Sequence, residues 1–95
     1  MEPQEEAQRR EVCYSGRVQG VGFRYTVRSL ARQFAVTGYV KNLPDGRVEL
    51  VVEGRAEEIR GLLRAIQVEM GHYIRDVGET PLRASGGFSG FEVRF

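Results

Sequence analysis

The sequence predicts an α+β sandwich in which two helices cover one face of a mostly antiparallel sheet. In two stretches, residues 23–34 and 56–70, apolar residues recur at steps of three and four, as in helices that bury one face. Around these stretches apolar and polar residues tend to alternate, which is typical of strands. With 95 residues, the chain is long enough for a single domain with one hydrophobic core.

The first predicted strand covers residues 11–17. Residues 1–10 are polar and charged, and we expect them to form a flexible N-terminal tail ahead of a single domain at 11–95. The first helix begins at Phe23, and its apolar stripe runs through Val27 and Leu30 to Phe34.

A β-hairpin follows, with strands at residues 37–43 and 47–53. The turn Pro44-Asp45-Gly46 joins them, because proline presets φ, aspartate caps locally and glycine is permissive. The second helix covers residues 56–70, and Gly71 is expected to end it.

A fourth strand is predicted at residues 73–80 and is expected to end before Pro81. Residues 83–87 read as loop, and residues 88–95 form an additional C-terminal edge strand. The order strand, helix, strand, strand, helix, strand is that of a ferredoxin-like βαββαβ sandwich.

The stretch from Gly16 to Arg24 is the strongest functional signal from the residues alone. Three glycines in seven residues precede the first helix, so unpaired backbone N–H groups gather beside the positive end of the helix dipole. Arg24 adds a permanent positive charge in the first helical turn. Together these features predict an anion site, most naturally for phosphate.

Topology brings Asn42 to the same place. The helical crossover makes the first two strands parallel, so both end at the same edge of the sheet. If Val40 faces the helices, the pleat turns Asn42 the same way. A carboxamide can both donate and accept hydrogen bonds, so it could hold a water molecule beside a bound phosphate.

Composition excludes several classes of function. With 14 basic and 13 acidic residues, the chain lacks a field that would bind nucleic acid or membrane in bulk, and we expect neither as a partner. A single cysteine, Cys13, excludes an intramolecular disulfide and favours a cytoplasmic location. The only histidine, His72, stands apart, so no zinc cluster or serine triad is predicted. We expect a monomer.

Three segments resemble the acylphosphatase family. They are the loop Gly-Arg-Val-Gln-Gly-Val-Gly-Phe-Arg at 16–24, Tyr-Val-Lys-Asn at 39–42, and the ending Phe-Ser-Gly-Phe-Glu-Val-Arg-Phe at 88–95. The resemblance implies metal-independent hydrolysis of a small acyl phosphate to a carboxylate and inorganic phosphate, with no cofactor.

The resemblance also implies residue roles. Arg24 would bind the phosphate and Asn42 would orient the attacking water, whose proton would pass to the substrate phosphate. In some family members the terminal carboxylate approaches the catalytic arginine, which raises the same question for Phe95. The phosphate would also be bound by backbone N–H groups of the loop, at Gly16, Arg17, Val18, Gln19, Gly20 and Val21.

Two other hypotheses remain at this point. One is an accessory domain that handles carbamoyl phosphate, as in the longer hydrogenase maturation factors that carry a similar loop. The other is a nucleic-acid-binding module of the same strand order, which stacks bases on aromatic residues of its central strands. Here the corresponding strands offer only Tyr14, and the second carries Glu49 and Glu53.

Overall fold

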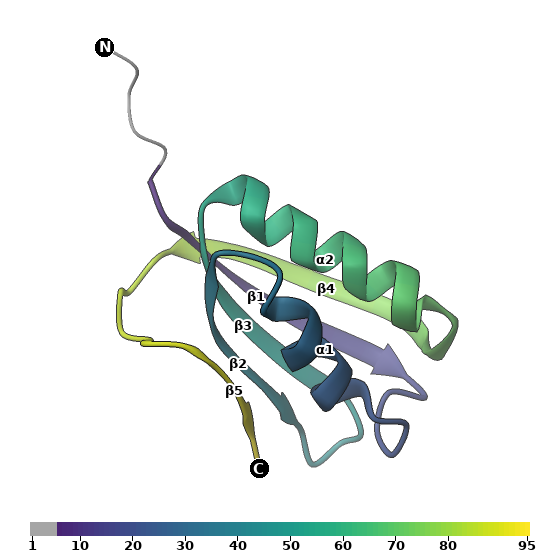
Figure 1. Ribbon diagram of the computed structural model, residues 1–95. Coiled ribbons are helices and arrows are strands. Elements are labelled where there is room, and N and C mark those ends of the chain that lie inside the picture. Colours follow the sequence, from purple (N-terminus) through teal and green to yellow (C-terminus); the bar gives the residue numbers. More distant parts are fainter. Residues whose placement is uncertain (1–5) are drawn as a thin grey trace.

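The computed structural model describes residues 6–95 and shows two helices packed on one face of a five-stranded sheet (Figure 1). The elements in chain order are β1 (Gln8–Gly16), α1 (Phe23–Ala31), β2 (Val36–Asn42), β3 (Val48–Gly54), α2 (Ala56–Met70), the 3-10 turn η1 (Gly71–Tyr73), β4 (Ile74–Arg83) and β5 (Phe91–Arg94). This order confirms the predicted ferredoxin-like sandwich and its additional C-terminal strand.

The strands lie in the order β4-β1-β3-β2-β5. The central strand β3 pairs antiparallel with both β1 and β2, so β1 and β2 run in the same direction. β5 lies at the edge and pairs parallel with β2. The predicted geometry is therefore confirmed: the C-terminal ends of β1 and β2 lie at one edge of the sheet.

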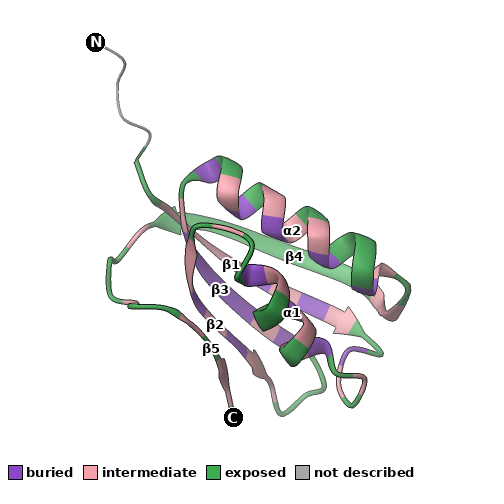
Figure 2. Ribbon diagram, viewed as in Figure 1, coloured by how far each residue is buried: buried purple, intermediate pink, exposed green. Residues whose placement is uncertain are grey.

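The hydrophobic core fills the space between the helices and the sheet. β3 is buried along most of its length (Figure 2). Val48, Leu50 and Val52 are buried as predicted, but Val51 and Glu53 are buried as well, so burial does not alternate along this strand. α1 contributes Phe23 and Val27 from its apolar stripe. Burying each large aliphatic or aromatic side chain is worth roughly 1.5–3 kcal/mol relative to its exposure. The core is thus the main force holding both helices against the sheet.

α1 is shorter than its apolar stripe predicts. It ends at Ala31, and the chain continues in a tight turn in which Phe34 N donates to Ala31 O at 3.1 Å. Phe34 still packs against the core from this turn. The helical periodicity therefore records burial correctly but overestimates the helix length.

β1 begins at Gln8, earlier than the predicted start at Glu11. Residues 8–10, which we expected in the tail, pair with β3 on one side and β4 on the other. Strand pairing uses backbone groups, so polar side chains can be accommodated where the strand is only half-buried. Residues 1–5 of the predicted tail lie outside the described residues.

The last two strands also differ from the prediction. β4 continues through Pro81 to Arg83, because it is an edge strand and a missing N–H is tolerated there. β5 begins only at Phe91 instead of Phe88. Residues 84–90 form a connection that crosses from one edge of the sheet to the other (Figure 1).

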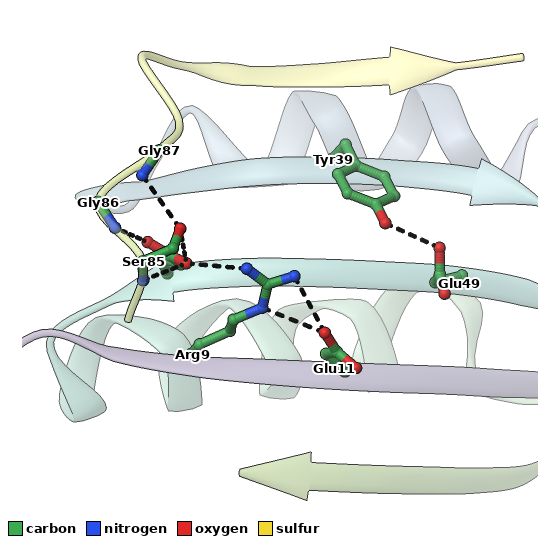
Figure 3. Close-up of polar contacts among 8 residues, drawn as sticks. Arg9, Glu11, Tyr39, Glu49, Ser85, Gly86 and Gly87 are labelled. Carbon is green, nitrogen blue, oxygen red and sulfur yellow. Dashed lines mark hydrogen bonds and ion pairs between the residues drawn. The ribbon is translucent and has the colours of Figure 1, made fainter. Parts of the chain in front are cut away.

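A buried carboxylate on β3 holds this connection in place. Glu53 is only 4% exposed, and its carboxylate accepts hydrogen bonds from Ser85 N at 2.8 Å, Ser85 Oγ at 2.7 Å and Gly86 N at 2.9 Å. Arg9 Nη1 lies 3.3 Å from the same carboxylate. Figure 3 shows Arg9, Ser85 and Gly86 with dashed lines that mark these contacts.

These contacts decide the charge state of Glu53. Burial alone would raise the pKa of the carboxyl group, but the donors from Ser85 and Gly86, with the charge of Arg9, lower it below the ordinary value of 4.5. A lowered pKa means that the stabilisation is complete above pH 4.5 and is lost as the pH falls through the pKa of the folded state.

We expect Glu53→Gln to lower the free energy of unfolding by about 1–3 kcal/mol at pH 7, because an amide cannot accept from all of these donors. The difference from the wild type should shrink as the pH falls below 4.5. Thermal unfolding followed by circular dichroism between pH 7 and pH 3 measures it. Glu69→Gln, at an exposed position on α2, is the control. A difference that stays constant across this range would contradict the assignment.

Candidate active site

A small pocket lies at the edge of the sheet where β1 and β2 end. Its volume is about 100 Å³, and its lining residues are Val18, Gly20, Gly22, Phe23, Arg24, Tyr25 and Asn42. The glycine loop, the start of α1 and the end of β2 therefore meet in one concave site. This meeting of the three segments is the one that the topology predicts.

The loop reaches this geometry through two glycines in left-handed backbone conformations. Gly20 and Gly22 both have φ of 78°, a region that residues with a Cβ rarely adopt. Gly22 is also the N-cap of α1, and its carbonyl accepts from Thr26 N at 3.0 Å. The helix therefore begins at the pocket, with the positive end of its dipole directed there.

The two ends of the predicted phosphate loop differ in what their backbone can offer. Arg17 N donates to Tyr73 O at 2.9 Å, so this group is already used to fasten the loop. Within the described residues 6–95, the N–H groups of residues 18–21 have no hydrogen-bond partner. Gly16, Arg17, Gln19 and Val21 are not among the lining residues. The available donors are thus concentrated from Val18 onward.

The side chain of Arg24 is held by the C-terminal strand. Its Nη1 donates to Arg94 O at 3.1 Å, and its guanidinium carbon lies 4.6 Å from the centre of the Phe95 ring. The family resemblance raised the terminal carboxylate of Phe95 as a partner of Arg24, whereas the contacts of Arg24 involve the Phe95 ring and the carbonyl of Arg94. Neither contact neutralises the positive charge, so Arg24 keeps its charge for an anion.

Asn42 presents an unsatisfied acceptor in the same pocket. Val40 is fully buried against the helices, and two residues later Asn42 faces the same side, as the pleat predicts. Its Oδ1 is buried and has no hydrogen-bond partner among residues 6–95. Leaving such an atom unpaired costs about 1–3 kcal/mol. An O–H donor from a water molecule would satisfy it.

The lining includes residues that the sequence analysis did not assign to the phosphate site. Gly22 and Phe23 complete the turn into α1, and Tyr25 lies at the rim with 55% of its surface exposed. Phe23 packs on the buried Tyr14, with ring centres 5.2 Å apart. The motif itself could have indicated Gly22, since it is the glycine that caps the helix.

The donor set of the pocket suits an oxyanion. It combines backbone N–H groups, a helix N-terminus and a guanidinium group, which is forked to match phosphate oxygens. Across residues 6–95, no three His, Cys, Asp or Glu side chains are grouped as a metal ion would require. His72 is exposed in η1, directly after α2. In the described part of the chain, no helix is long and apolar enough to span a membrane.

Comparison with known proteins points to one family. The acylphosphatase family model matches residues 10–93. An acylphosphatase of Rubrobacter xylanophilus is 45% identical over 99% of this chain and 86% of its own length. The crystal structure of acylphosphatase from Bacillus subtilis superposes with a TM-score of 0.83 and 31% identity, covering 93% of this chain and 99% of that one.

A second structural likeness concerns part of a much longer protein. HypF of T. kodakarensis matches with a TM-score of 0.80 and 30% identity, but this chain covers only 12% of it. The acylphosphatases of Rubrobacter xylanophilus and Bacillus subtilis instead match over most of both chains, in sequence and in fold respectively. The chain accordingly belongs to the acylphosphatase family, whose members hydrolyse acyl phosphates.

Proposed function

We propose that this chain hydrolyses acyl phosphates with Arg24 and the 18–22 backbone holding the phosphoryl group and Asn42 holding the attacking water. The observation that carries the proposal is the buried, unpaired Oδ1 of Asn42 in the same pocket as Arg24. A water molecule that donates to this oxygen would be oriented beside a phosphate bound by the loop.

The reaction is a displacement at phosphorus. The water oxygen forms a bond to phosphorus while the bond from phosphorus to the acyl oxygen breaks, and the carboxylate leaves with that electron pair. The proton lost by the water passes to a phosphate oxygen, so the products are a carboxylate and inorganic phosphate. A carboxylate is a stable leaving group, so no protein acid is required.

Catalysis then depends on position and charge. The transition state of phosphoryl transfer spreads negative charge over the equatorial phosphate oxygens. Arg24 and the helix N-terminus are preorganised to stabilise this charge. The contacts of Arg24 with Arg94 O and Phe95 fix its guanidinium before substrate arrives.

We also propose a cytoplasmic monomer without a nucleic-acid partner. The lone Cys13 supports a reducing compartment. Tyr14, the one aromatic residue that the central strands offered for base stacking, is only 2% exposed and so is not available to a nucleic acid. A small acyl phosphate fits the size of the pocket.

We expect Arg24→Ala to lower kcat/KM for benzoyl phosphate by about a hundredfold or more, because it removes the main charge in the site. Both kcat and KM should change, since the group contacts the phosphate before and during reaction. Steady-state kinetics measures both. Arg28→Ala, one turn further along α1 and exposed, should retain wild-type rates. Equal losses in the two variants would refute the role of Arg24.

We expect Asn42→Ala to lower kcat by about a hundredfold with little change in KM, because the water is positioned for the transition state rather than for substrate binding. The same assay measures it, and a circular dichroism spectrum checks that the variant is folded. An unchanged kcat in the folded variant would remove Asn42 from the mechanism.

We expect excess EDTA to leave the rate of benzoyl phosphate hydrolysis unchanged, because Arg24 and the loop supply the positive charge that a metal ion would otherwise provide. The measurement is the initial rate before and after dialysis against the chelator. A loss of activity that added divalent metal restores would contradict the mechanism.

A further inference from the structure

The side chain of Gln19 bridges the glycine loop and the β2–β3 hairpin. Its Nε2 donates to Leu43 O at 2.8 Å and to Arg47 O at 2.9 Å. A primary amide nitrogen carries two hydrogens, so both are used. Because both partners are carbonyl oxygens, only the nitrogen end of the carboxamide can face them.

The two carbonyls belong to the pair that closes the hairpin. Leu43 N donates to Arg47 O at 2.8 Å, and Gly46 N donates to Leu43 O at 3.1 Å. Gln19 thus attaches to the most constrained point of the turn. This is a firm anchor for a loop that lacks regular secondary structure.

The bridge joins the two halves of the pocket. Gln19 lies between Val18 and Gly20, which line the pocket from the loop, and Leu43 directly follows Asn42. Among residues 6–95, it is the only side chain of the 17–22 loop that hydrogen-bonds to the hairpin. The opposite end of the loop is fastened separately, through Arg17 N and Tyr73 O.

We propose that Gln19 is a positioning residue that sets the distance between the phosphate-binding backbone and Asn42. This inference rests on the proposed function, in which the loop holds phosphorus and Asn42 holds the attacking water. In-line attack requires the two to be aligned closely, and a displacement of about 1 Å can cost about a hundredfold in rate. Gln19 acts through its side chain, in addition to any contact its backbone makes with phosphate.

The test is Gln19→Met, which keeps the length of the side chain and removes both donors. We expect kcat for benzoyl phosphate to fall about tenfold or more, because the water and the phosphorus lose alignment. Competitive inhibition by inorganic phosphate should change by less than about threefold, since phosphate contacts only the loop half. Gln33→Met, at an exposed position beyond α1, should leave kinetics unchanged.

A double-mutant cycle separates positioning from simple destabilisation. Once Asn42→Ala has removed the water-orienting group, Gln19→Met should lower the residual kcat by less than about threefold, because the alignment no longer matters. Equal losses in both backgrounds, or an unchanged kcat in the single variant, would overturn the proposal. A wild-type enzyme inactive on benzoyl phosphate would instead overturn the proposed function.

A measurement on the wild type remains decisive if Gln19→Met does not fold. Both side-chain amide protons of Gln19 should exchange with solvent much more slowly than those of the exposed Gln33. NMR of the ¹⁵N-labelled protein measures the exchange. Equally fast exchange at the two residues would show that the bridge is absent and would overturn the proposal.

Discussion

The shared direction of β1 and β2 is the constraint on which the site depends. Both strands pair antiparallel with β3, so they end at the same edge although the whole of α1 separates them in the chain. β3 is held there by Val48, Leu50 and Val52, which are fully buried. The glycine loop after β1 and Asn42 at the end of β2 are then neighbours because of the strand order alone.

A second chain of contacts reaches the pocket from the opposite end of the sheet. Glu53 fixes Ser85 and Gly86, and Gly38 N donates to Gly90 O at 2.9 Å, so the connection that precedes β5 is anchored at both ends. β5 then pairs with β2 in one register, and the carbonyl group of Arg94 in β5 accepts a hydrogen bond from the guanidinium of Arg24 in α1. The buried carboxylate of Glu53 therefore helps to hold the strand that contacts Arg24, the residue proposed to bind phosphate.

The sequence predicted the parts of the site that follow from the two-residue alternation of a strand and from the order of the elements. The pleat places Asn42 on the same face of β2 as Val40, and the helical crossover brings the end of β2 beside the glycine loop. Neither step requires knowledge of individual side-chain contacts. The contacts of Arg24 with β5 and the bridge from Gln19 could not be predicted, because each joins a side chain to a backbone carbonyl far away in the chain. The start of β1 was missed because residues 8–10 show no apolar alternation.

The extension of β4 through Pro81 has a consequence for solubility. An edge strand of ten residues exposes a row of backbone groups that could pair with another sheet and seed aggregation. Arg75, Asp76, Glu79 and Arg83 add charges of both signs along it. At the other edge β5 is only four residues long. Both borders of the sheet are thus protected against intermolecular strand addition.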